Sequence, residues 1–285
     1  MNTKCAKIQL PQSDQETPAE AGRKSFWTAL PRVSLSETTL SDAPFQLLPR
    51  AVYSADQLEA SLRWQQAYAE AASSELSLSV LVSLRHWDTP AIDVFFESLR
   101  PQSFRNFEVL VAASLGSEQW NSARAIIDRL ALPVVLLATP GENTESDDLR
   151  QLSEACLGAW VVPVVHPGFL HPQALYLLSQ RAEQTFADVI FTNEVLVDAQ
   201  LHPITYVRRP PVDQLSLLGS NLSGESLCLR RETAYECLHA NEMRGVAADI
   251  LPWRFWVWIA QAGLGCERLP LALQLQFART AGADP

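Results

Sequence analysis

The chain has 285 residues, 47% hydrophobic and 19% charged, so it can bury a large core in one or two domains and is not disordered as a whole. Its formal net charge of −10 argues against a nucleic-acid binder, because neutralising phosphates requires basic patches. We expect no transmembrane segment, since no apolar run reaches about 18 residues, and no ordinary secretory signal, since the start is polar.

The five cysteines lie far apart and include no C-x-x-C pair: Cys5, Cys156, Cys228, Cys237 and Cys266. Such a scattered, odd set predicts buried thiols in a reducing compartment and argues against a disulfide framework or a zinc site. We therefore expect a cytoplasmic protein, and leave open a peripheral association with the inner membrane. A bacterial source is a separate expectation.

The first part of the chain differs in composition from the rest. Residues 1–48 are rich in Ser, Thr, Gln, Glu and Pro and lack sustained periodicity, which predicts a flexible arm. Phe26 and Trp27 form an apolar island within it, which either docks on a partner or tucks against its own domain. Residues 49–75 contain helical spacing and good helix formers, and we interpret them as a helical lead-in.

From residue 76 the sequence alternates between strand and helix patterns. We expect strands at 76–84, 107–113, 133–138, 159–165 and 188–194, and helices at 90–100, 122–131, 145–157 and 171–184. In the third helix Asp147 and Asp148 fall in the first turn, where the helix dipole favours them. This order predicts an α/β domain over 76–277, with a mostly parallel sheet flanked by helices and a tail at 278–285. In such sheets ligands bind beyond the carboxyl ends of the strands.

Four blocks carry a further signal, and they occur in a fixed order along the domain. They are residues 102–108 (QSFRNFE), 158–178 (opening GAWVVPVVHPG), 187–210 (opening ADVIFTNEV) with 217–221 (LLGSN), and 253–263 (WRFWVWIAQAG). Together they resemble the family 2 glycosyltransferases. The resemblance implies a GT-A fold, a nucleotide-sugar donor, a divalent cation and transfer of a sugar to an acceptor hydroxyl.

The departures from this family fall on its chemical positions. The family ends its second strand in carboxylates that hold the nucleotide, where this chain has Ala113 and Ser114. The family ends its fourth strand in Asp-x-Asp, which holds the cation, where this chain has Val-His-Pro centred on His166. The family's general base is an aspartate, where this chain has Pro252, which has no titratable group.

These departures predict a degenerate donor cleft near Ser83, Ala113, Ser114 and His166, with no catalytic residue, no metal site and no cofactor. His166 is interpreted as a surface turn residue, because a lone imidazole is a poor magnesium ligand.

Two carboxylates are candidate replacements for the missing base, Asp249 and Glu194. The plainer interpretation of Asp249 is an exposed residue at a helix start, and that of Glu194 is a surface carboxylate.

The leading hypothesis is a catalytically inactive glycosyltransferase-like protein that serves as an accessory or scaffold in glycan assembly. The alternatives are a divergent, metal-independent transferase that uses a nucleotide-sugar donor, and a non-catalytic sensor of nucleotides or sugars. A partner, such as an active glycosyltransferase, is expected to contact Phe26, Trp27 or Trp258. Because Trp253, Trp256 and Trp258 cannot share one helical face, at least one of them is expected to be exposed or to cover the former acceptor cleft.

Overall fold

The computed structural model describes residues 76–130, 132, 134–198, 201, 203–207 and 225–278. The predicted arm, with Phe26 and Trp27, the lead-in at 49–75 and all but the first residue of the tail lie outside these described residues.

Strands and helices alternate through the first half of the domain. They are β1 (Leu78–Ser83), α4 (Thr89–Leu99), β2 (Phe107–Ser114), α5 (Glu118–Leu130), β3 (Val134–Thr139), α6 (Glu145–Ala155) and β4 (Trp160–Val164). The second half is less regular. It consists of β5 (Gly168–Leu170), α7 (Ala174–Gln184), β6 (Val189–Val197), β7 (Pro203–Val207), β8 (Leu227–Arg230), α9 (Arg231–His239), a 3-10 turn (Asn241–Met243), α10 (Leu251–Ala262) and β9 (Cys266–Phe277).

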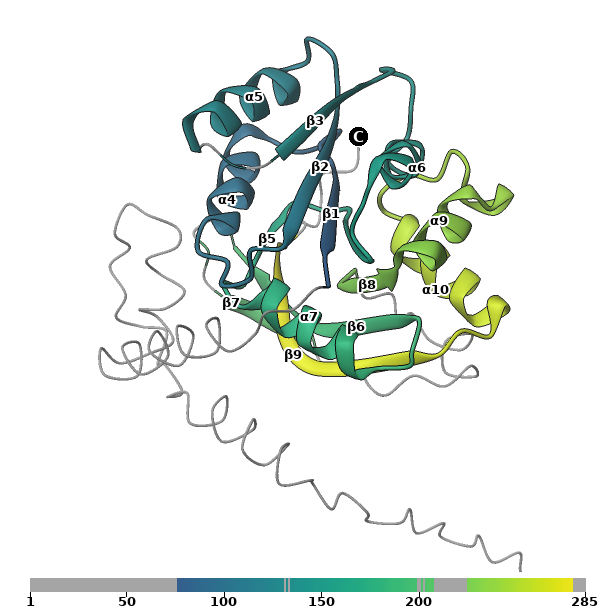
Figure 1. The fold of residues 1–285 in the computed structure, drawn as a ribbon. Helices are drawn as coiled ribbons and strands as arrows, with labels where there is room; N and C mark the ends of the chain where they lie inside the picture. The colour runs from purple at the N-terminus through teal and green to yellow at the C-terminus, as the bar shows by residue number, and fades with distance from the viewer. Residues whose placement is uncertain are drawn as a thin grey trace, which may run out of the picture.

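The strands form one curled sheet in the order β3-β2-β1-β4-β8-β6-β9-β5, with β7 paired to β6 (Figure 1). The first four strands in this order all run parallel, and so do β6 and β9. β8 joins the two parallel parts by running antiparallel to both β4 and β6. The predicted α/β architecture is confirmed, and its parallel part begins at the predicted first strand.

Local sequence explains where the helices begin and end. Asp88 caps α4, because its carboxylate accepts from the backbone N–H of Ala91 at 2.8 Å, and a proline follows in the first turn. In α6 the Asp147 carboxylate accepts from the backbone N–H of Thr144, which completes a capping box. Gly263 ends α10 in the left-handed conformation, with φ 67°.

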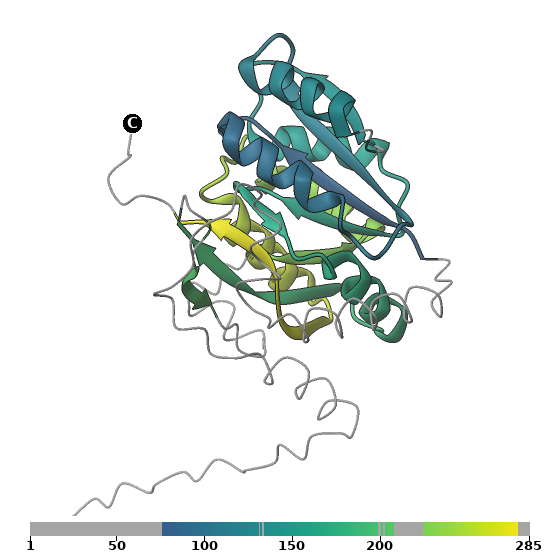
Figure 2. The same ribbon diagram turned by 90° about the vertical axis from the view of Figure 1, so that its left-hand side faces the viewer.

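The sheet separates two hydrophobic cores. α4, α5 and α7 pack on one face, where alternate residues of β1 and β2 such as Val80 and Val109 are buried. α6, α9 and α10 pack on the other face, against Leu81 and Leu110. Figure 1 shows α4 and α5 to the left of the strands and α6, α9 and α10 to the right, and Figure 2 looks onto the face that α4 and α5 cover. The alternation follows from the period of two in a strand, and both faces are covered, as expected of a parallel sheet.

Several boundaries differ from the sequence prediction. β4 ends at Val164, one residue before the predicted end, and α7 begins at Ala174 and not at residue 171. No helix within the described ranges is both long and apolar enough to cross a membrane.

Candidate functional site: the carboxyl edge of the parallel strands

The carboxyl ends of the parallel strands meet at one edge of the sheet. Ser83 ends β1, Ser114 ends β2, Thr139 ends β3 and Val164 ends β4. In open α/β sheets this edge holds the ligand. Here it is dominated by Arg85, which lies two residues beyond the end of β1.

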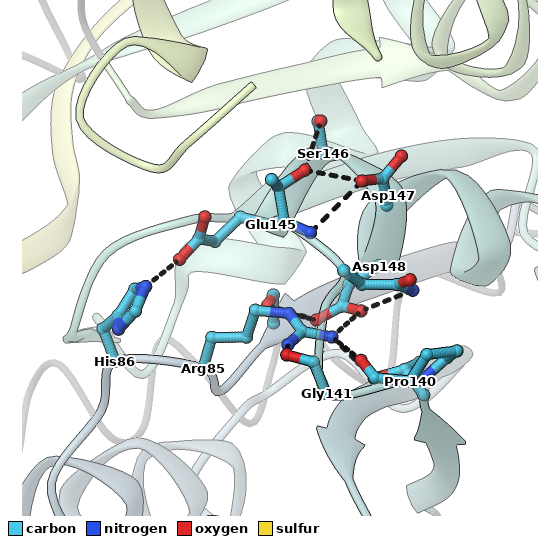
Figure 3. A network of polar contacts seen from close by, with 12 residues as sticks. Arg85, His86, Pro140, Gly141, Glu145, Ser146, Asp147 and Asp148 are labelled. Atoms are coloured by element: carbon cyan, nitrogen blue, oxygen red, sulfur yellow. Dashed lines mark hydrogen bonds and ion pairs between the residues drawn. The ribbon is translucent and has the colours of Figure 1, made fainter. Parts of the chain in front are cut away.

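The Arg85 side chain reaches from β1 past the end of β2 to the loop after β3 (Figure 3). Its Nη1 donates to the Gly141 carbonyl at 2.9 Å, and its Nη2 donates to the Pro140 carbonyl at 2.6 Å. Nη2 also donates to Thr139 Oγ1 at 3.2 Å and to an Asp148 oxygen at 2.9 Å. Nε lies 2.8 Å from the second Asp148 oxygen, as an ion-pair contact. Both terminal nitrogens of the guanidinium therefore donate hydrogen bonds, and Nε has the Asp148 carboxylate as its charged neighbour.

Asp148 completes this pair from the first turn of α6. Its side chain is 0% exposed, and that of Arg85 is 9% exposed, so the two charges face each other away from water. Ser83 donates a hydrogen bond to Asp148 Oδ2 at 2.8 Å, and Asn143 donates one to Oδ1 at 3.3 Å. A buried carboxylate without such partners would be strongly destabilising, so these contacts hold the Asp148 side chain in place.

The sequence analysis missed this pair. The sequence analysis expected Asp148 only as a residue of the first helical turn, where the helix dipole favours a carboxylate. It did not single out Arg85. The available signal was the position of Arg85 two residues after a mostly apolar strand, where a long cation has little reason to lie unless a buried anion faces it.

The start of α6 also holds the loop that precedes α10. His86 Nε2 lies 2.9 Å from Glu145 Oε1, and Glu145 Oε2 accepts from the backbone N–H of Ala248 at 3.0 Å. Ser146 Oγ accepts from the backbone N–H of Val246 at 2.9 Å. Figure 3 shows His86 and Glu145 beside the Arg85 pair. The loops after β1 and β3 and the loop before α10 are thus joined through one helix start.

The predicted donor-cleft residues gather at this edge in part. Ser83 and Ala113 are buried, and Ser114 is half-buried at the end of β2. A Cβ added at Gly141 would lie 3.5 Å from Ser114 Oγ, so the loop after β3 passes close over β2. No carboxylate projects from the end of β2, because its last residues are Ala112, Ala113 and Ser114.

His166 lies in the turn after β4, but the surface interpretation is wrong. The residue is 9% exposed, and its Nδ1 lies 2.5 Å from Glu225 Oε2. Neighbouring Val165 is buried at 4% exposure and packs in the core that contains α6 and α10. The turn is therefore anchored by packing on one side of His166 and by an ion-pair contact at the imidazole.

Glu194 is also buried, which overturns its interpretation as a surface carboxylate. It is 2% exposed, and its Oε1 accepts from the backbone N–H groups of Glu225 and Ser226, at 2.5 and 2.8 Å. Its carboxylate therefore fixes the chain just before β8, next to the residue that pairs with His166. Asp249 is exposed, as expected, and precedes α10 without capping it.

The aromatic residues of α10 divide between core and surface, as the helical period requires. Trp256 is buried and packs edge-on against Phe191, with ring centroids 5.4 Å apart. Trp258 is half-buried and packs against the same core. Trp253 is 43% exposed, with the Arg254 guanidinium 5.4 Å from its ring centroid. The prediction that at least one is exposed is confirmed, and Trp253 is the most exposed of the three. Pro252, in the place of the family's base, is buried in the first turn.

Metal-binding chemistry requires several ligands in one place. Among the residues that the structure describes, no three His, Cys, Asp or Glu side chains gather in a way that could hold a metal ion. The His166–Glu225 pair at the end of β4 has two such groups.

Comparison with known proteins finds solved structures of similar fold, among them several of one protein. No protein-family model matches the chain, and no curated protein sequence matches it significantly. The crystal structure of S. aureus TarS 1-349 matches with a TM-score of 0.54 at 15% identity, covering 71% of this chain and 60% of that one. The same protein in complex with UDP matches at 0.53, and in complex with UDP-GlcNAc at 0.52, each at 14% identity.

TarS is a family 2 glycosyltransferase, and at this level of identity the similarity concerns the fold alone. The chain spans about three-fifths of the length of these solved structures. The predicted GT-A-like fold, an α/β sheet flanked by helices, is confirmed.

Proposed function

We propose that this chain is a catalytically inactive, family 2 glycosyltransferase-like protein that serves as an accessory or scaffold in glycan assembly. The coarse part of this statement, a glycosyltransferase-like fold, rests on the similarity to TarS. The finer part rests on the chemistry of the carboxyl edge.

The observation that carries the proposal is the turn after β4. Val165 offers a hydrocarbon side chain that is buried in the core, and Pro167 offers neither a ligand nor an N–H group. His166 is the one metal-ligating side chain of this turn, and its Nδ1 faces Glu225. A magnesium-type cation prefers several oxygen ligands near octahedral geometry. The residues present therefore do not fit the cation on which the family's chemistry depends.

The replacement carboxylates support the proposal as well. A general base must be able to reach a substrate hydroxyl. Glu194 is buried, and its Oε1 already accepts two backbone hydrogen bonds, so this carboxylate is engaged in holding the chain before β8. Asp249 is exposed and lies two residues before the start of α10, and its side chain does not cap the helix. Two alternatives remain, and the following experiment distinguishes them from the proposal. One is a metal-independent transferase that uses either residue, and the other is a nucleotide or sugar sensor.

The experiment is a titration with uridine, guanosine and thymidine diphosphate sugars, each with and without Mn²⁺, followed by calorimetry and by the melting temperature. A ligand stabilises by RT ln(1 + [L]/Kd), so about 1 mM Mn²⁺ on a site of about 1 μM affinity would add about 4 kcal/mol. We expect no metal-dependent shift, and no difference between the wild type and His166→Ala in response to Mn²⁺.

A metal-dependent shift that His166→Ala abolishes, together with release of free nucleotide from a donor, would replace the proposal with an active transferase. Tight binding without turnover would replace it with a sensor.

A further inference from the structure

The crevice beyond β1, β2 and β3 is occupied by the protein itself. Arg85 starts at the end of β1 and ends on the loop after β3, and β2 lies between these strands. Gly141, whose carbonyl accepts from Arg85, lies close to Ser114 at the end of β2, so the guanidinium is held near the strand ends where open α/β sheets receive a ligand. The small side chains of Ala113 and Ser114 lie at this end of β2.

The groups that face the guanidinium are all hydrogen-bond acceptors. They are the carbonyl oxygens of Pro140 and Gly141, the hydroxyl of Thr139 and both carboxylate oxygens of Asp148. A planar cation with N–H donors along its edges matches such a set. The edge of a nucleobase also carries N–H donors, so an uncharged base could donate hydrogen bonds to the same acceptors.

We propose that Arg85 is a built-in occupant of this crevice and is the residue that excludes nucleoside diphosphates from it. The inference rests on the proposed function, and it assigns the exclusion to one side chain. To admit a nucleoside, the guanidinium would have to leave a nine-tenths buried position and expose Asp148, which is 0% exposed in the closed arrangement. The apparent affinity of a ligand is its affinity for the open state multiplied by the fraction of molecules that are open, so a rarely open site binds weakly.

The first turn of α6 reinforces this exclusion. A helix start ordinarily attracts phosphate, but three of the first four residues of α6 are Glu145, Asp147 and Asp148. Each has an internal partner: His86 for Glu145, Arg150 for Asp147 and Arg85 for Asp148. The positive end of the helix is thus neutralised within the chain.

The test removes the Arg85 side chain in two variants. Arg85→Ala leaves the Asp148 charge unpaired and can destabilise the fold, so Arg85→Ala with Asp148→Asn removes both charges together. Arg129→Ala is the matched control, because Arg129 forms a surface pair with Asp93 and its side chain is 55% exposed. The probes are guanidinium chloride, uridine diphosphate and guanosine diphosphate, read by melting temperature and calorimetry.

We expect about 10 mM guanidinium to raise the melting temperature of Arg85→Ala, but not that of the wild type or of Arg129→Ala, beyond the effect of equal NaCl. We expect the double variant to bind at least one of the two nucleotides about tenfold or more tightly than the wild type does.

Equal nucleotide affinity in the wild type and the double variant would overturn the proposal that Arg85 excludes nucleoside diphosphates. Absence of rescue by guanidinium would overturn the assignment of an acceptor-lined site. Both failures leave the proposed function standing if the wild type binds no donor. Wild-type binding with turnover would instead overturn the proposed function.

Discussion

At the residue scale, His171 couples the fold to pH. Its imidazole lies just after β5, where Nδ1 accepts from the backbone N–H of Gln173 at 3.2 Å, and burial lowers its pKa from 6.5 to about 4. A lowered pKa means that the unfolded chain binds a proton that the folded chain refuses. Stability is therefore fully present above about pH 6.5 and is lost as the pH falls toward about 4.

We predict that the free energy of unfolding falls by about 1–3 kcal/mol more in the wild type than in His171→Asn between pH 7 and pH 4. The asparagine oxygen can accept from the Gln173 N–H without titrating. Urea unfolding at a series of pH values measures this difference. Parallel pH profiles for the two proteins would contradict the prediction.

The chemistry of the site was only partly readable from single residues. The sequence could indicate which groups are absent at Ala113, His166 and Pro252, because this needs only residue identity. It could not indicate that Arg85 and Asp148 form a buried pair, since they lie 63 positions apart in the sequence and pair only when α6 packs behind β1. Glu194 was misassigned for the same reason: its partners lie 31 and 32 positions further along the chain.

At the scale of elements, the entry into β4 depends on one glycine. A Cβ at Gly158 would lie 2.5 Å from the backbone nitrogen of Ser79 in β1, which leaves no room for a side chain. The Gly158 N–H also donates to Ser79 Oγ at 2.8 Å and to Glu108 at 3.2 Å. This junction joins β1, β2 and β4 at their starts.

We predict that Gly158→Ala lowers the free energy of unfolding by about 3 kcal/mol or more, because the backbone of a central strand would have to move. Gly265→Ala is the control. Its added Cβ would meet ordinary contacts at 3.5 Å or more, and we expect a change below about 1 kcal/mol. Chemical denaturation of both variants measures the difference, and equal costs would show that the junction adapts.

The strands of the first half of the fold could be predicted from the sequence more directly than those of the second half. In β1 every residue is buried, and the run ends in polar residues, so its pattern predicts a strand directly. β9 alternates apolar and polar residues over part of its length, but its partners β5 and β6 are distant in sequence, and its pairing with β6 shifts register at two places. Such a strand is defined by tertiary contacts more than by its own pattern.

At the scale of the whole molecule, the first 48 residues of the chain provide a further prediction. Residues 1–48 lie outside the described part, and their composition predicts a flexible arm. We predict that limited proteolysis with trypsin cleaves at Lys24 and Arg32 and leaves a stable fragment that starts near residue 50. Mass spectrometry of the fragments measures this.

Protection of Lys24 and Arg32 in the free protein would contradict the prediction. Protection that appears only with a candidate partner would point to Phe26 and Trp27 as a docking element.

The position of Arg85 has a consequence for how the stability of this protein depends on its surroundings. A protein that is stabilised by a ligand becomes more or less stable as the ligand concentration changes. Arg85 belongs to the chain, so it cannot dissociate, and its concentration at the site does not change with the supply of any metabolite. If Arg85 fills this place as proposed, the stability of this part of the fold does not depend on the concentration of any nucleotide in solution.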